Sequence, residues 1–284
     1  MKARKTIRRW PPWRRLHEWV VEVTTADPIQ IESARPRLRD CLLGEIVKIL
    51  SAKSTSVTIA LSIGVAVFVT VLITVFNDGS ANPLSLSLIG PFLGTWLLVV
   101  LAANVVATEY STGMIQQSLA VTPRRGRLIA SKLLFVAAIS LLSGLVLSFL
   151  CYAVGQLILS GTDRPSIGLG DVSTVRAVTV TGVFTLIYPL IAASLAFVTR
   201  HATGAVLLTL LIAFFPMVMA ELGSSTWAEI AVRFAPGGPM ESLTGQAQPG
   251  TVGYMETGSA VGVTIGWLSI FVAAAFASQL RRDE

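Results

Sequence analysis

The sequence predicts an all-α integral membrane protein with six transmembrane helices. Of its 284 residues, 53% are hydrophobic and only 13% are charged, and the mean hydropathy is +0.70. Soluble domains carry about 25% charged residues, so a chain this apolar cannot cover its surface in water. Six stretches are long enough to cross a bilayer and lack Asp, Glu, Lys, Arg and His, apart from Glu221 at the edge of the fifth. We therefore expect spans at 57–76, 86–107, 133–159, 178–198, 202–222 and 260–280.

The positions of the cations predict how the chain crosses the membrane. An even number of spans places both termini on one side, and that side then carries 19 of the 22 Lys and Arg residues, all except Arg164, Arg176 and Arg233. Because cytoplasmic loops collect Lys and Arg, we expect cytoplasmic N- and C-termini in a multi-pass protein of a bacterial plasma (inner) membrane. Attraction to anionic membrane lipid then explains the net charge of +6, and no nucleic-acid partner is expected.

The residues before the first span divide into two parts. Residues 1–37 combine Lys and Arg with three Trp, which predicts a basic cytoplasmic tail that either lies in the headgroup layer or stays disordered. In 38–54, apolar residues recur at helical spacing with the charges largely on other faces, which predicts an amphipathic interfacial helix. A helical extension of the first span is disfavoured, because it would carry charges into the bilayer. The transmembrane domain is therefore expected to cover 38–284.

Three features of the later chain predict packing inside the bundle or near its surface. Gly258, Gly262 and Gly266 recur every four residues, a spacing that lets two helix backbones approach closely. We expect this stripe to pack within the chain, with a dimer seam as the alternative. Asn104 lies deep in the second span and is expected to hydrogen-bond another helix, with a polar contact to substrate in the pore as the alternative. The connection 221–259 is expected to hold a short helix, either on the outer surface or dipping into the outer leaflet.

Motifs of hydrolytic and nucleotide-binding enzymes are missing from the sequence. It contains no HExxH, GxSxG or GxxxxGK[ST] pattern, and its two histidines stand on separate segments. We therefore expect no catalytic residue, no metal site and no directly bound cofactor. The predicted spans also lack the inward carboxylates that ion-coupled transporters use. An ion-coupled secondary transporter or a channel subunit accordingly stays only the alternative function.

The connection between the second and third spans carries the most distinctive pattern. Met114, Ile115, Ser118 and Leu119 form the apolar side of a short helix, which Pro123 and a cationic stretch follow. A solvated loop would explain the charges but not the apolar side. The pattern therefore predicts a cytoplasmic helix that docks against another protein.

This connection resembles that of the membrane subunits of ABC exporters of the ABC-2 type. In that family an acidic residue ends the second helix, a Gly follows, an apolar helix ends in Leu, a Pro precedes an Arg, and a Lys opens the third helix. The matching positions here are Glu109, Gly113, Leu119, Pro123, Arg125 and Lys132, with Met114 where Thr is frequent. The resemblance also covers the interfacial helix, the six spans and the long last outer loop, and it leaves 1–37 outside.

The resemblance implies the permease subunit of an ATP-driven exporter of small or amphiphilic cargo, such as a drug, peptide or lipid. A separate ABC subunit, present in two copies, would bind ATP and Mg, and a second permease, identical or homologous, would complete the transporter. An importer permease fits less well, because its EAA loop places a Gly six residues after the Glu, whereas Gly113 follows Glu109 by four. The residues that would couple to the ATPase subunit are Glu109, Tyr110, Gly113, Met114, Ile115, Leu119, Pro123 and Arg125.

Overall fold

The computed structural model of the chain describes residues 53–77, 81–114, 125–162, 164–222, 226–251 and 253–280. Within these ranges every regular element is an α-helix, and six helical segments are long and apolar enough to cross a membrane. These segments are Lys53–Phe76, Pro83–Ser111, Gly126–Gly161, Val172–Thr199, Ala202–Met219 and Thr257–Gln279. The prediction of an all-α, multi-pass membrane protein is confirmed. The predicted tail 1–37 and most of the predicted interfacial helix 38–54 lie outside the described residues.

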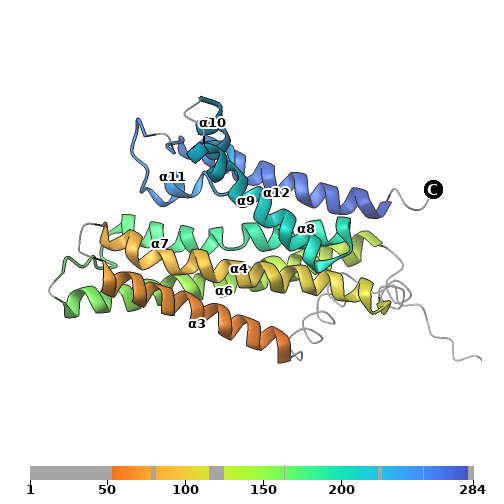
Figure 1. Ribbon diagram of the computed structural model, residues 1–284, viewed down its shortest axis with the longest axis horizontal. Coiled ribbons are helices and arrows are strands. Elements are labelled where there is room, and N and C mark those ends of the chain that lie inside the picture. Colours follow the sequence, from red (N-terminus) through yellow and green to blue (C-terminus); the bar gives the residue numbers. More distant parts are fainter. Residues whose placement is uncertain are drawn as a thin grey trace, which may run out of the picture. The chain divides into compact units, whose positions relative to one another are not determined.

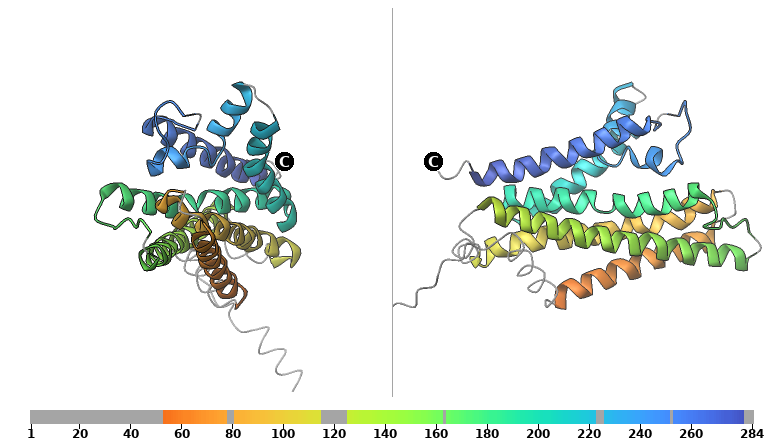
Figure 2. Two further views of the ribbon diagram at one scale, coloured as in Figure 1. Left: turned by 60° about the vertical axis from the view of Figure 1, so that its left-hand side comes forward. Right: turned by 180° about the vertical axis from the view of Figure 1, so that it is seen from behind.

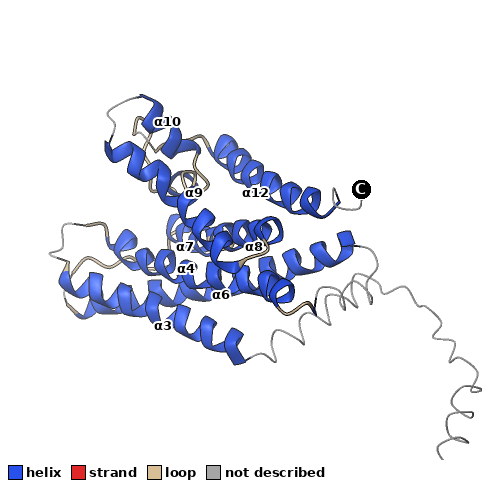
Figure 3. Ribbon diagram, turned by 45° about the vertical axis from the view of Figure 1, so that its right-hand side comes forward, coloured by secondary structure: helices blue, strands red, loops and turns tan. Residues whose placement is uncertain are grey.

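The long helices run alternately in opposite directions, side by side (Figures 1 and 2). Short loops join most of them (Figure 3). In chain order the helices are α3 (Lys53–Phe76), α4 (Pro83–Ser111), α6 (Arg125–Gly161), α7 (Val172–Phe184), α8 (Ile187–Thr199), α9 (Ala202–Leu222), α10 (Thr226–Phe234), α11 (Met240–Thr244) and α12 (Thr257–Leu280). We call the end of the bundle where α8 meets α9 the Arg200 end, and the opposite end, near α11, the α11 end.

Helix α4 extends beyond the predicted window 86–107 at both ends. It begins after Asn82, whose Oδ1 accepts a hydrogen bond from the Leu84 N–H at 2.9 Å, and Pro83 occupies the first position, where no donor is needed. It ends at Ser111, and Gly113 follows with φ +70°, a left-handed conformation common just after helix ends. Glu109 therefore lies inside α4 and not in a loop.

The core of the bundle is centred on α4 and the α7–α8 pair. In the apolar windows of these two spans 67% and 78% of the residues are buried, against 11% in those of α9 and α12. Thr185 and Leu186 separate α7 from α8, and Pro189 stands in the first turn of α8, where its missing N–H costs no helical hydrogen bond. The most buried span is thus made of two helical pieces.

Close helix contacts depend on glycines that the sequence analysis did not single out. A Cβ added to Gly90 of α4 would overlap the Ala66 carbonyl oxygen of α3. A Cβ on Gly144 of α6 would overlap both the Gly182 carbonyl oxygen and the Thr185 hydroxyl. At these positions only hydrogen fits between the two helices, so glycine permits the short interaxial distance.

The glycine stripe of α12 does not make such contacts. A Cβ on Gly258, Gly262 or Gly266 would meet no atom of the described residues within 4 Å. Helix α12 instead packs through a different side, on which Val272 and Ala275 join the core. The stripe therefore makes no close helix contact within the described residues, and its dimer-seam alternative stays a prediction.

Asn104 also faces away from the core. Its side chain is exposed, and its Nδ2 donates to the Val100 carbonyl of the same helix at 2.9 Å. The adjacent Ala103 is fully buried, so the rotation of α4 turns Asn104 outward. Thr108, one turn later, is likewise exposed and donates back to the Asn104 carbonyl at 2.7 Å. The expected hydrogen bond from Asn104 to another helix is absent from the described part of the chain.

In its described residues the connection 221–259 holds two short helices, α10 and α11, which lie beside α9 and α12 (Figure 1). The indole N–H of Trp267 donates to the Phe234 carbonyl at 2.7 Å. Trp267 stands about 15 Å along α12 from its start at Thr257, at 1.5 Å per residue. A Cβ on Gly237 would crowd the hydroxyl of Tyr188, which belongs to the core. These contacts join the turn between α10 and α11 to α12 and to α8, and whether the connection lies on the outer surface or dips into the outer leaflet stays a prediction. We call residues 226–244 the α10–α11 hairpin.

Hydrogen bonds to the fourth span hold the hairpin in place. Arg176 of α7 donates from Nε to the Leu243 carbonyl at 2.8 Å and from Nη2 to the Ser242 carbonyl at 3.2 Å. These carbonyls lie at the end of α11, where the Ser242 carbonyl also accepts the Gly245 N–H at 3.2 Å. One guanidinium group therefore fixes the end of α11 against α7.

Candidate functional site

The candidate site lies at the Arg200 end, where α4 finishes and α6 begins. Glu109 of α4 and Lys132 of α6 form an ion pair there, with 2.9 Å between Oε1 and Nζ. Their side chains are only 3% and 1% exposed, and Lys132 is the largest fully buried side chain of the described residues. Both charges had been excluded from the predicted spans, but the structure places both inside long helices.

The surroundings of this pair are apolar. Val106, one turn before Glu109, is buried, and so are Ile129 and Val136, one turn to either side of Lys132. Neither charge could stay in such a position alone, since an isolated ion in a low-dielectric interior is strongly destabilised. The opposite charge on the facing helix makes both positions tolerable, so the pair fixes the register of α4 against α6.

Tyr110, the next residue of α4, contacts a different part of the bundle. The guanidinium carbon of Arg200 lies 5.5 Å from the centroid of the Tyr110 ring, a cation–π arrangement. Arg200 ends α8 in a left-handed conformation with φ 60°, and its N–H donates to the Ala196 carbonyl at 2.9 Å. The end of α4 is thereby joined to the turn between α8 and α9. In the sequence Arg200 is a lone cation between two apolar stretches and contributes to the predicted topology, but nothing there indicates its contact with Tyr110.

A third polar contact joins α12 to the same end of the bundle. Gln279, 8% exposed, donates from Nε2 to the carbonyl of Phe197 in α8 at 3.2 Å. Ion pair, ring contact and hydrogen bond together connect α4, α6, α8 and α12 near the Arg200 end. No sequence motif marks Gln279, because its partner is a backbone carbonyl distant in the sequence.

The structure describes only part of the predicted coupling segment. Gly113 is left-handed, and a Cβ there would meet no described atom within 4 Å, so glycine is favoured at this position by its φ angle and not by crowding. Met114 follows with 38% of its surface exposed. Arg125 is the first residue of α6. The remaining predicted residues, Ile115, Leu119 and Pro123, lie outside the described residues.

The described residues contain no group of three or more His, Cys, Asp or Glu side chains that could hold a metal ion. What the site does contain is a neutralised charge pair at the two ends of the connection, together with the exposed side chain of Met114 where the connection begins.

Comparisons with known proteins add no family. No protein-family model matches the chain, and no curated protein matches it. Fold and site define the chain as a multi-pass α-helical membrane protein whose second and third spans are joined by a buried ion pair.

Proposed function

We propose that the chain is the permease subunit of an ATP-driven ABC exporter of the ABC-2 type, which moves small or amphiphilic cargo out of the cell. The observation that supports this most directly is the Glu109–Lys132 pair. It joins α4 to α6 where the connection resembling a coupling helix leaves the bundle and returns to it. A segment that receives force from another protein needs such a stiff attachment.

The geometry accounts for how force would travel. A displacement of the connection acts on the end of α4 and the start of α6, and the ion pair makes these two helix ends move together. The Tyr110–Arg200 contact passes the displacement to α8 and α9, and the Gln279 hydrogen bond links α12 to α8. Packed helices that move as one body are a common basis for switching between two states.

The proposal assigns the remaining parts of the transporter. The Arg200 end faces the cytoplasm together with both termini, and the α11 end faces outward, in a bacterial plasma membrane. Two ABC subunits bind ATP and Mg and receive the connection between α4 and α6. A second permease, identical or homologous, forms the other half of the passage, and membrane lipid surrounds both.

Co-purification tests the proposal. The full chain, purified in mild detergent from its native host, should bring with it a nucleotide-binding subunit whose ATP hydrolysis depends on the chain. Recovery of the chain without such a subunit, together with cargo movement in liposomes that contain no nucleotide, would contradict it.

One observation favours the second candidate, an ion-coupled transporter or channel. Glu109 is a carboxylate within a membrane-spanning helix, whereas the predicted spans contained none except Glu221 at the edge of the fifth. Carboxylates at such positions carry protons or cations in many transporters. Lys132 already neutralises Glu109, which makes the structural role the stronger explanation. Liposomes with an imposed proton or sodium gradient distinguish the two, because only the second candidate would transport cargo there without ATP.

A further inference from the structure

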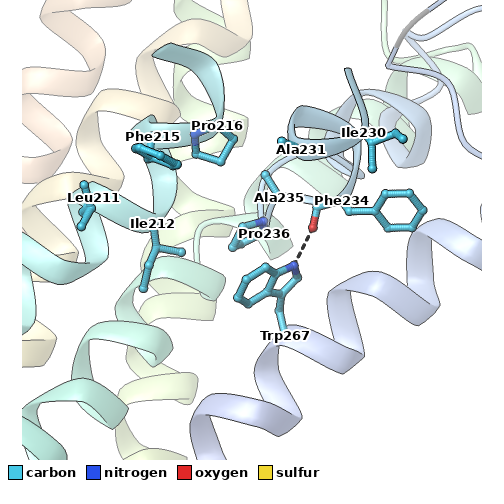
Figure 4. Close-up of a pocket in the computed structure, with 10 residues that line it drawn as sticks. All are labelled: Leu211, Ile212, Phe215, Pro216, Ile230, Ala231, Phe234, Ala235, Pro236 and Trp267. Atoms are coloured by element: carbon cyan, nitrogen blue, oxygen red, sulfur yellow. Dashed lines mark hydrogen bonds between the residues drawn. The ribbon is translucent and has the colours of Figure 1, made fainter. Parts of the chain in front are cut away.

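Two cavities lie side by side where the α10–α11 hairpin meets the neighbouring spans. The first has a volume of about 540 Å³ and lies between α9, α10 and α12 (Figure 4). Its walls include Leu211, Phe215, Pro216, Ile230, Phe234 and Trp267. Every lining side chain is apolar or aromatic, and the one N–H among them, that of Trp267, is already donated to the Phe234 carbonyl. The size is that of an ordinary ligand pocket, and the chemistry is that of a site for hydrocarbon.

The second cavity differs in character. Its volume is about 380 Å³, and it shares Pro216 and Ala235 with the first, so the two are neighbours around the same turn. Its walls add polar and charged groups, among them Arg233, Glu241 and Gln246, to aromatic side chains of the spans. A hydrocarbon cavity thus adjoins a cavity with charged walls.

The two charged side chains of the second cavity are exposed, and neither has a partner among the described residues. At the same end of the bundle, Arg164 donates to the Thr74 carbonyl at 3.0 Å, and Arg176 donates to two carbonyls of α11. Within the described part of the chain, the side chains of Arg233 and Glu241 make neither a hydrogen bond nor an ion pair, with each other or with any other residue. A cation and an anion that line one cavity without pairing are available to a ligand that carries both charges.

We propose that the two cavities together bind one zwitterionic amphiphile with a single alkyl chain. The alkyl chain occupies the apolar cavity, and the head group occupies the second, with its anionic group at Arg233 and its ammonium group at Glu241. The rings of Phe92 and Tyr188, which also line the second cavity, favour an ammonium group further. The proposal goes beyond the exporter function and does not depend on it, because binding needs neither nucleotide nor a partner subunit.

A photoactivatable probe tests the site directly. The full chain in nanodiscs of phosphatidylglycerol is exposed to dodecylphosphocholine that carries a diazirine in its alkyl chain. We expect cross-links on peptides of α9 and α10, and we expect unlabelled dodecylphosphocholine to compete better than dodecyl maltoside. Cross-links spread evenly over all membrane-facing helices would overturn the site, and equal competition by the maltoside would overturn the zwitterionic head group.

Two substitutions of alanine by phenylalanine form a matched pair. Ala231 lines the apolar cavity, so in A231F the added ring takes up space that the alkyl chain would occupy, and labelling should fall by about tenfold. Ala274 is exposed on α12 and lines neither cavity, so A274F should leave labelling unchanged. Equal labelling of the two variants would contradict the proposal. If A231F does not give a monodisperse protein, the competition between dodecylphosphocholine and dodecyl maltoside on the unaltered chain still tests the proposal.

Single-charge probes separate the roles of the two charged residues. R233Q should weaken binding of dodecyl phosphate by about two- to fivefold and spare dodecyltrimethylammonium, and E241Q should do the reverse. If neither variant discriminates between the probes, the head-group assignment is wrong. Mass spectrometry of the purified chain then distinguishes two sources of such a ligand: a resident lipid accompanies the protein, whereas transported cargo binds only when added.

Discussion

Glu109 Oε1 and Lys132 Nζ lie 2.9 Å apart in the interior of the bundle, one on the last turns of α4 and the other on the first turns of α6. Each charge makes the other tolerable, and each would be strongly unfavourable alone. The two charges are therefore coupled: removing one of them should destabilise the fold far more than removing both.

Removal of one charge should therefore be costly. We expect E109Q and K132M each to lower the free energy of unfolding by about 3–5 kcal/mol, because each leaves one buried ion without its partner. The double variant E109L/K132M should lose much less than the sum. Denaturant unfolding in detergent measures this. The control K53M, at an exposed lysine of α3, should stay within about 0.5 kcal/mol of the unaltered chain. Single variants that match this control would refute the coupling.

Glycine substitutions should separate crowded from open positions. G144A forces a methyl group against the Gly182 carbonyl oxygen and the Thr185 hydroxyl, and we expect a loss of about 1–3 kcal/mol. Gly64 has no described atom within 4 Å of the added carbon, so G64A should be neutral or gain up to about 1 kcal/mol from helix propensity. Thermal unfolding of both variants measures which of them is less stable. A destabilised G64A together with a G144A of normal stability would contradict the prediction.

Arg176 should control the local stability of α11. R176Q removes the guanidinium that binds the Leu243 and Ser242 carbonyls, so amide exchange in Met240–Thr244 should become faster. Hydrogen–deuterium exchange with peptide resolution measures this. R164Q releases the Thr74 carbonyl instead and serves as the control, with exchange at α11 unchanged. If amide exchange at α11 were equally fast in R176Q and in the unaltered chain, contacts other than those of Arg176 would be enough to stabilise α11.

A pair of engineered cysteines tests the orientation. Ser111 is exposed at the Arg200 end and Gln248 is exposed beyond α11. In a background without Cys41 and Cys151, a membrane-impermeant maleimide added to intact cells should label Q248C and spare S111C, because the cation distribution predicts that the Arg200 end lies inside. Permeabilised cells should show labelling of both. The opposite pattern in intact cells would invert the topology.

Met114 tests the coupling role. Because 38% of its surface is exposed, M114D should fold normally and yet disturb an apolar contact with an ATPase subunit. We expect co-purification of that subunit to fall and ATP-dependent transport to be lost. V172D, at an apolar side chain that is 85% exposed at the opposite end, should keep both. Normal transport by M114D would remove Met114 from the coupling surface.

The spans could be predicted from the sequence because long charge-free stretches are hard to place anywhere but in a bilayer. The ends of the spans were harder to predict. The span predicted at 133–159 extends over Gly126–Gly161 in the structure, and α4 continues past Glu109. A rule that excludes every charge from a span cannot recognise two opposite charges, distant in sequence, that neutralise each other in the fold. The coupling role of this connection stays a prediction, and the buried ion pair at its two ends was not foreseen.

Packing partners were harder to predict than spans. The stripe at Gly258, Gly262 and Gly266 has the right spacing for close approach, yet Gly90 and Gly144 make the tight contacts. Spacing along one helix defines a stripe but not the direction in which it faces, since that direction depends on the rotation of the helix in the bundle. Asn104 was misplaced for the same reason.

The turn between α8 and α9 consists of Arg200 and His201 alone, since α8 ends at Thr199 and α9 begins at Ala202. So short a tether prevents the two helices from parting at that point. Helix α9 is also sparsely packed, with 11% of its apolar window buried. A helix that is fixed at one end and makes few contacts along its length has the most freedom at its other end. If α9 moves away from its neighbours, the gap that forms should therefore open first, and close last, next to the α10–α11 hairpin.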